Sequence, residues 1–240
     1  MNKGFKTAAL EYQSGNMVDS PKMTIEGTVT KTLILFAVVI SAGALSWANL
    51  ETLVNSGAFF PVLFLSMFGA LGLSFWVSFS KKVQVGGIIA YSILEGIFIG
   101  MFSAFLEAMY PGIVIQAVSA TLITSGVIFI AWKAGWIKVT DRFLKFLLFA
   151  MVGYLIFGLI NLGFAFFTGT SAYNSEFGWV IALLGCGLAA FSLAADFQII
   201  TKGQEVGLPQ ENEWRGAYGL MVTLVWLYVE ILRLLAITRN

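Results

Sequence analysis

The sequence of 240 residues contains no histidine. This absence excludes Ser–His–Asp triads, HExxH metal sites and any imidazole-based pH switch. Any proton chemistry near neutral pH would therefore have to involve a carboxyl group. The chain also has a single cysteine, Cys186, which lies within an apolar run, so an intrachain disulfide is excluded.

Charged residues are scarce as well. They make up 11% of the chain, whereas a soluble domain carries about 25%. Hydrophobic residues make up 58% of the chain, which predicts that most of the protein lies in a lipid bilayer. The formal net charge of +1 suggests no nucleic-acid partner and no strongly acidic one.

Seven apolar runs are long enough to cross a bilayer, which takes about 20 residues in a helix. They are Val29–Ala48, Ala58–Phe79, Val85–Leu106, Ile113–Trp132, Phe143–Thr168, Phe177–Ile200 and Gly216–Ile237. The sequence therefore predicts an all-α integral membrane protein with seven transmembrane helices. We expect residues 1–28 to form an N-terminal tail, residues 29–237 a seven-span membrane domain and residues 238–240 a C-terminal tail. Residues 1–28 lack the pattern of a signal peptide.

The distribution of basic residues predicts the orientation of these spans. Lys and Arg cluster before the first span and after the second, fourth and sixth, whereas the alternate loops carry only Glu51, Glu107 and Glu176 as charged residues. Since cytoplasmic loops are the basic ones, the N-terminus is expected in the cytoplasm.

Small residues in the spans predict close helix packing. Gly96 and Gly100 form a GxxxG motif in the third span, and Gly153, Gly158 and Gly163 are spaced along the fifth.

Three acids lie within predicted spans, namely Glu95, Asp196 and Glu230. A charged group at this depth costs roughly 2.5 to 3.5 kcal/mol, so it normally faces a partner or a water-filled path. Arg233 follows Glu230 by three residues, which places both on one helix face. The two could form an intrahelical pair, or Arg233 could extend to the outer interface. Arg233 can neutralise only one of the three acids.

Buried carboxyl groups suggest a proton-controlled path. A low-dielectric site favours the neutral form of a carboxyl group, and two neighbouring carboxyls can share one proton. When deprotonated, they offer the oxygen ligands that calcium prefers. We therefore expect a pH-dependent cation pathway lined by carboxylates. The alternative for Asp196 is a cap near the cytoplasmic end of its span.

Three segments resemble a known family: Glu95-Gly96…Gly100, Asp196-Phe-Gln-Ile-Ile, and Leu227-Tyr-Val-Glu230-Ile-Leu-Arg-Leu-Leu. Over about residues 27 to 237 the chain is similar to the Bax inhibitor-1 family, also called transmembrane Bax-inhibitor-motif proteins, and most of all to a bacterial branch. The resemblance implies a seventh helix at the centre of a bundle of six. It also implies a pH-sensitive calcium leak in the bacterial inner membrane, with no cofactor.

By this resemblance Asp196 and Glu230 would form the gate and proton sensor and bind calcium, with Glu95 and Arg233 as further buried polar residues. The chain differs from the family in three respects. It has glutamate at position 230 where aspartate is common, a longer link between the two acids, and no arginine in the second span.

The depth of the acids leaves two arrangements open. At about 1.5 Å per residue, Asp196 lies roughly 9 Å from Lys202, and Glu230 roughly 22 Å from Arg215. Either the seventh helix begins well inside the cytoplasm, so that Glu230 is level with Asp196, or Glu230 faces Glu95. The resemblance favours the first arrangement.

Enzyme classes fit the sequence poorly. Intramembrane serine and metal proteases need histidine, and Leu193-Ala-Ala-Asp196 lacks the GxGD signature of intramembrane aspartyl proteases. We expect no enzymatic activity. The alternative function is a membrane stress protein that modulates a membrane-bound ATP-dependent protease and has no transport role. In that case the tail and the cytoplasmic loops would carry the function.

Overall fold

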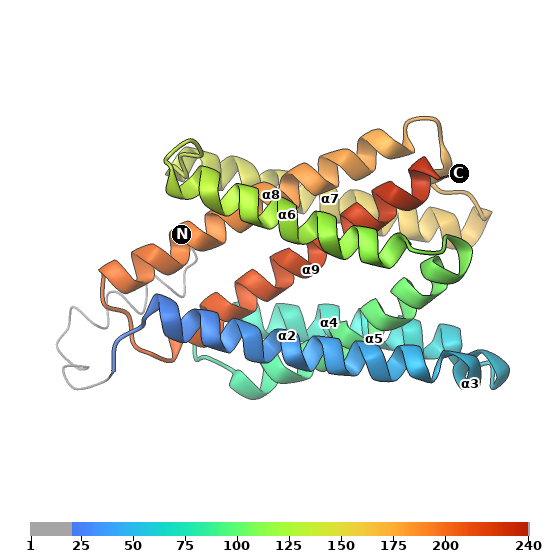
Figure 1. Cartoon of the computed structure of the whole chain (residues 1–240), viewed down its shortest axis with the longest axis horizontal. Coiled ribbons are helices and arrows are strands. Elements are labelled where there is room, and N and C mark those ends of the chain that lie inside the picture. The colour runs from blue at the N-terminus through green and yellow to red at the C-terminus, as the bar shows by residue number, and fades with distance from the viewer. Residues whose placement is uncertain (1–20, 240) are drawn as a thin grey trace. The chain divides into compact units, whose positions relative to one another are not determined.

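A computed structural model of the chain describes residues 21–239 (Figure 1). Seven helices in this part are long and apolar enough to cross a membrane: α2 (Ile25–Ala48), α4 (Phe59–Phe79), α5 (Val85–Met109), α6 (Ile113–Lys133), α7 (Asp141–Thr168), α8 (Gly178–Glu205) and α9 (Asn212–Thr238). Two short helices, α3 (Leu50–Asn55) and the 3-10 helix η1 (Ala172–Asn174), lie in connections. The described residues contain no strand, so the prediction of an all-α protein with seven candidate spans is confirmed.

Large apolar side chains cover much of the surface of these helices. Leu65, Phe79 and Phe167 are 73%, 81% and 85% exposed. Apolar surface on this scale is unfavourable in water but suits contact with the hydrocarbon core of a bilayer. The helices are therefore those of a multi-pass membrane protein.

The predicted tails and orientation are not settled by these helices. Most of the N-terminal tail, residues 1–20, lies outside the described residues, and α2 begins at Ile25 rather than at Val29. The cytoplasmic location of the N-terminus and the central position of the seventh helix stay predictions.

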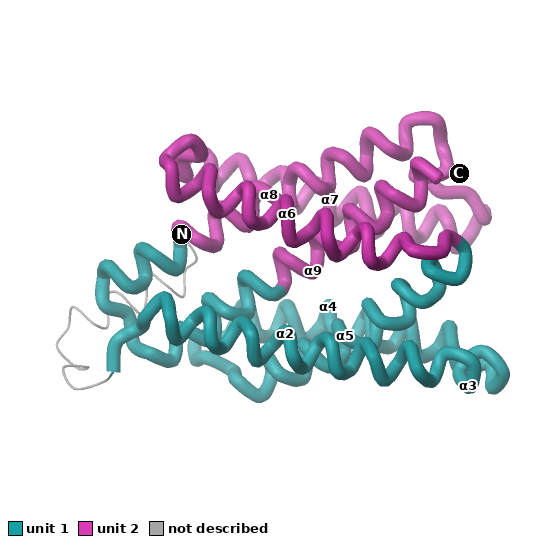
Figure 2. The backbone as a smooth tube through the Cα atoms, viewed as in Figure 1, with its two compact units in different colours: residues 1–109, 199–221 teal, residues 110–198, 222–240 magenta. Residues whose placement is uncertain are grey.

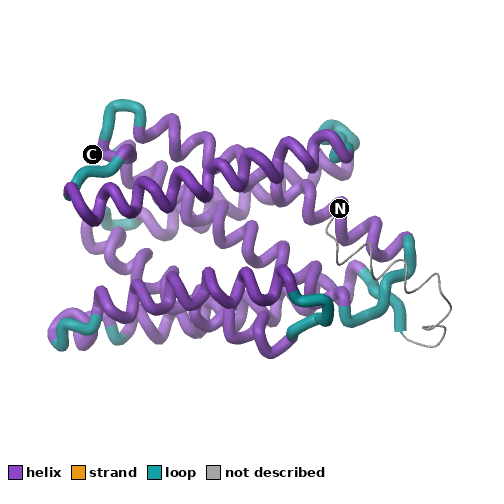
Figure 3. The backbone as a smooth tube through the Cα atoms, turned by 180° about the vertical axis from the view of Figure 1, so that it is seen from behind, coloured by secondary structure: helices purple, strands orange, loops and turns teal. Residues whose placement is uncertain are grey.

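The chain divides into two compact units (Figure 2). Unit 1 consists of the chain up to Met109 together with Ile199–Met221, and unit 2 consists of Tyr110–Gln198 and Val222–Asn240. The boundary falls inside α8 and inside α9, so each of these helices contributes residues to both units. Turns and loops join the helices at their ends (Figure 3).

In unit 1, α2 and α5 pack through glycine. A Cβ atom added to Gly100 would lie 2.7 Å from the Cα atom of Gly43, and one added to Gly96 would lie 2.8 Å from the Cβ atom of Ala42. The two backbones therefore approach too closely for larger residues, as the GxxxG motif predicts.

The glycines of α7 behave differently. A Cβ atom at Gly153, Gly158 or Gly163 would have nothing within 4 Å. The prediction of close packing along this helix is therefore wrong. Spacing alone shows that a helix has small residues, but not that a neighbour lies against them.

The link between α8 and α9 is bonded to the residues that precede α2. The backbone N–H of Met23 donates to the carbonyl oxygen of Leu208 over 2.7 Å, and the N–H of Gln210 donates to the carbonyl oxygen of Pro21 over 2.8 Å. Residues of this link thus bind the segment that leads into the first span by main-chain hydrogen bonds.

The first turn of α9 adds an acid to this junction. Glu213 is fully buried, accepts hydrogen bonds from the N–H and the hydroxyl of Thr24 over 2.9 Å each, and forms an ion pair with Lys31 of α2. Thr24 also caps α2, because its hydroxyl accepts a hydrogen bond from the N–H of Gly27. The carboxylate of Glu213 therefore binds both the capping residue of α2 and Lys31 of the same helix. The start of α2 is therefore fixed to α9.

Candidate functional site

Glu95 lies in unit 1, in a polar cluster that joins three helices. Tyr91, one turn earlier on α5, makes a side-chain hydrogen bond with Glu95. The ring of Tyr91 meets the ring of Tyr218 on α9 edge to face, with 5.2 Å between centroids, and the Tyr218 hydroxyl donates to Ser74 of α4 over 2.8 Å. Glu95 forms no ion pair with any described residue.

Asp196 lies on α8 in unit 2 and accepts a hydrogen bond from the hydroxyl of Thr223 on α9. Its neighbours Ala194 and Ala195 are buried. No basic side chain in residues 21–239 forms an ion pair with Asp196. Asp196 lies nine residues before the end of α8, and its partner is a side chain of α9. The alternative that Asp196 is a cap near the cytoplasmic end of its span stays a prediction.

Glu230 has a different environment on α9. Only 2% of it is exposed. Its carboxylate accepts hydrogen bonds from the Tyr154 hydroxyl over 2.9 Å, from the indole N–H of Trp226 over 3.1 Å, and from Arg233 over 3.1 and 3.2 Å. The intrahelical pair between Glu230 and Arg233, one of the two alternatives from the sequence, is thus present. A buried charge of this kind is stable because it is both paired and hydrogen-bonded.

The two acids do not share one site. Asp196 is bonded to Thr223, and Glu230 follows Thr223 by seven residues on the same helix, which corresponds to roughly 10 Å along its axis. The favoured prediction, that Glu230 would be level with Asp196, is therefore wrong: Thr223 takes this position. The alternative that Glu230 faces Glu95 stays a prediction.

Packing on α8 gives the same result. A Cβ atom at Gly185 would meet the carboxylate of Glu230 and the hydroxyl of Tyr154, so Gly185 is the α8 residue beside Glu230. Gly185 precedes Asp196 by eleven residues. Calcium binds oxygen at about 2.3 to 2.6 Å, so one ion cannot bind both carboxylates at this separation. The described residues also contain no group of three or more acidic, His or Cys side chains that could hold a metal.

The connection between α7 and α8 completes the surroundings of Arg233. Arg233 donates to the hydroxyl of Tyr173 in η1 over 3.0 Å, and its guanidinium carbon lies 4.5 Å from the centre of the Tyr173 ring. The hydroxyls of Tyr173 and Tyr154 are 3.2 Å apart. Sequence reasoning missed Tyr154, Tyr173, Trp226 and Thr223. Hydroxyl or indole groups within or beside a span are the only signal that could have indicated them.

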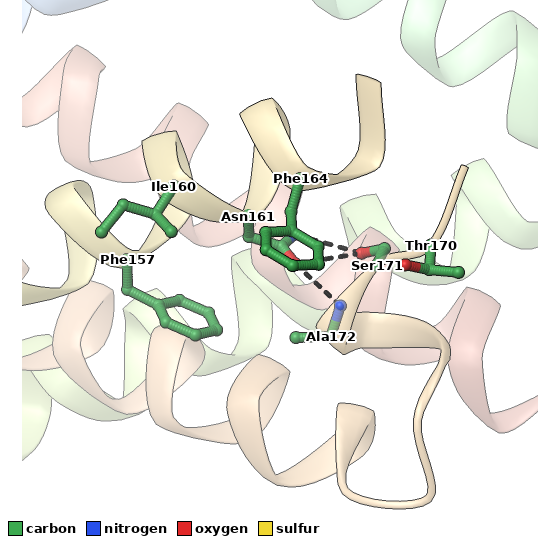
Figure 4. Close-up of a pocket in the computed structure, with 7 residues that line it drawn as sticks. All are labelled: Phe157, Ile160, Asn161, Phe164, Thr170, Ser171 and Ala172. Carbon is green, nitrogen blue, oxygen red and sulfur yellow. Dashed lines mark hydrogen bonds between the residues drawn. The ribbon is translucent and has the colours of Figure 1, made fainter. Parts of the chain in front are cut away.

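A pocket of about 380 Å³ lies beside this connection, between it and α7 (Figure 4). Asn161 of α7 holds the connection there. Its side-chain oxygen accepts from the N–H of Ala172 over 2.7 Å, and its amide donates to the hydroxyl of Ser171 over 3.1 Å. The lining residues are Phe157, Ile160, Asn161, Phe164, Thr170, Ser171 and Ala172. The lining includes none of the predicted site residues.

Comparison with known proteins identifies the family. No curated protein matches the chain. The family model described as Bax inhibitor 1 like matches residues 2–240. This match runs through both units and includes Glu95, Asp196, Glu230 and Arg233. The chain therefore belongs to the Bax inhibitor 1 like family.

Proposed function

We propose that the protein is a pH-sensitive calcium leak of the bacterial inner membrane, in which Asp196 and Glu230 control the path. The observation that carries the proposal is the environment of Asp196. It is an acid within a membrane-spanning helix that has a hydroxyl partner and forms no ion pair with a described residue. Such a group is a functional site by default, because its charge is costly in an apolar surrounding. The proposal includes no enzymatic activity.

Asp196 can act as a proton-controlled gate because Thr223 suits both of its states. A hydroxyl donates to a carboxylate and accepts from a protonated carboxyl group. When Asp196 is protonated, it is neutral, and the contact between α8 and α9 closes the path. When Asp196 loses its proton, no basic side chain among residues 21–239 forms an ion pair with its charge, so the carboxylate attracts a cation from water.

Glu230 contributes in a different way, because Arg233 already neutralises it. A cation that passes Glu230 has to compete with this guanidinium. We therefore place the two carboxylates in series along α9, each meeting the ion in turn, instead of as a pair that shares one proton. Glu95 in unit 1 is a third acidic group that a cation path could use.

The proposal is tested by measuring calcium flux into liposomes that contain the purified protein, from about pH 5 to about pH 8. Asp196→Asn keeps the size of the side chain and removes its titration, so we expect a flattened pH response. Glu205→Gln is the matched control, because Glu205 is an exposed acid on the same helix. A pH response that is unchanged in Asp196→Asn, or lost equally in Glu205→Gln, contradicts the role of Asp196.

The alternative function makes a different prediction. A modulator of a membrane-bound protease would lose its effect when residues 1–26 are removed and keep it in Asp196→Asn. A calcium leak would show the opposite dependence in the flux measurement.

A further inference from the structure

The connection between α7 and α8 is fixed at two places. On one side, Asn161 binds Ala172 and Ser171 (Figure 4). On the other side, Tyr173 binds Arg233. The first residue of α8 is also constrained, since a Cβ atom at Gly178 would meet the main chain of Tyr173. The connection thus carries Tyr173 to α9 on a short, anchored support.

Tyr173 holds Arg233 by two interactions of different kinds. Its hydroxyl accepts a hydrogen bond from the guanidinium, and the face of its ring lies 4.5 Å from the guanidinium carbon. This distance is within the range of a cation–π interaction. Tyr154, which donates to Glu230, lies within hydrogen-bond distance of the Tyr173 hydroxyl. Tyr173 therefore belongs to one continuous polar network with Glu230.

Arg233 is the more exposed partner of the ion pair with Glu230. The side chain of Arg233 is 29% exposed, whereas that of Glu230 is 3% exposed. If Arg233 moved away, Glu230 would lose its cover and its counter-ion together. Tyr173 is the residue outside α9 that holds Arg233 by both its ring and its hydroxyl.

We propose that Tyr173 is a positioning residue that keeps Arg233 on Glu230, so that the α7–α8 connection controls the access of water and ions to this carboxylate. The inference deepens the proposed function and rests on it for the permeant cation. With Tyr173 in place, Glu230 is covered and paired. When the connection releases Tyr173, Arg233 loses two interactions, and Glu230 becomes accessible to a cation.

The single cysteine of the chain provides a test that requires no transport. Cys186 directly follows Gly185, the α8 residue beside Glu230. The rate at which Cys186 in the full-length protein reacts with a charged, membrane-impermeant thiol reagent reports water access to this region. The measurement compares wild type with Tyr173→Phe and Tyr173→Ala.

We expect slow labelling of Cys186 in wild type and labelling at least about tenfold faster in Tyr173→Ala. A tenfold change corresponds to a loss of about 1.4 kcal/mol in the free energy that keeps the region closed. Tyr173→Phe keeps the ring over Arg233 and should give an intermediate rate. Thr170→Ala is the matched control, because Thr170 lies in the same connection and its hydroxyl bonds with Thr168. Its rate should equal that of wild type.

Three results would overturn the inference. One is an unchanged rate in Tyr173→Ala, and another is an equal increase in Thr170→Ala. The third is a parallel increase with a small neutral thiol reagent together with a lower unfolding temperature, which would indicate general loosening. A faster Cys186 reaction in Tyr173→Ala, in a protein that passes no calcium, would support the positioning role and refute the leak.

Discussion

The pair of Glu230 and Arg233 makes a quantitative prediction about stability. Glu230 accepts four hydrogen bonds, two of them from Arg233 and one each from Tyr154 and Trp226. Arg233→Met keeps most of the apolar stem but removes the charge, leaving a buried carboxylate with two neutral donors. Removing one partner of a buried pair costs about 3 to 5 kcal/mol. Because two donors remain, we expect a loss of about 3 kcal/mol, at the lower end of this range.

Thermal unfolding of the purified protein in detergent micelles measures this loss. In the double variant Arg233→Met/Glu230→Gln no charge is left unpaired, so most of the lost stability should return, and the double-mutant cycle isolates the pair interaction. Arg239→Met is the matched control, because Arg239 is exposed directly after the end of α9 and donates to Gln116 and to main-chain oxygens instead of to an acid. The reasoning is refuted if Arg233→Met is no less stable than Arg239→Met, or if the double variant is as unstable as Arg233→Met.

Two further predictions concern contacts in unit 1, and the first uses Gly153 of unit 2 for comparison. Gly100→Ala should destabilise the protein by about 1 to 3 kcal/mol, because the added methyl group meets the backbone of α2. Gly153→Ala places its methyl group in open space, so it should be neutral or stabilise the protein by up to about 1 kcal/mol through helix propensity. Equal unfolding temperatures for the two variants would contradict this prediction. Glu213→Gln should break the ion pair with Lys31 and speed amide hydrogen exchange at the start of α2. Glu211→Gln, a change at an exposed acid, should leave this exchange rate unchanged. An unchanged rate in Glu213→Gln would show that the ion pair does not stabilise the start of α2.

The seven spans were predictable from the sequence because lipid imposes a strong requirement on each helix. All seven apolar runs are helices, and several bounds agree to within one residue. The errors lie at polar ends. α2 begins four residues earlier than predicted, after the cap Thr24, and α9 begins four residues earlier, at Asn212. Hydropathy records where a helix is apolar, whereas polar caps and first turns extend the helix beyond that stretch.

The candidate site was predictable only in part, and the reason is the range of the interactions. The contact between Glu230 and Arg233 is local, so the spacing of three residues was sufficient to offer this pair as one of two alternatives. Tyr154 reaches Glu230 across 76 residues of sequence, and no spacing rule encodes such a contact. The distances along the helices, counted from Lys202 and Arg215, placed Asp196 and Glu230 at different levels. This difference agrees with the hydrogen bond between Asp196 and Thr223. The resemblance to the family led to the opposite expectation, because it transfers residue identities and not their geometry in this chain.

The measurement that tests the central claim most directly is calcium flux into liposomes containing the wild-type protein, compared with protein-free liposomes over the range from about pH 5 to about pH 8. The proposed function predicts a flux above that of protein-free liposomes, with a rate that changes with pH. A flux equal to that of protein-free liposomes at every pH would contradict the leak, and the buried acids Asp196 and Glu230 would then require a role in assembly.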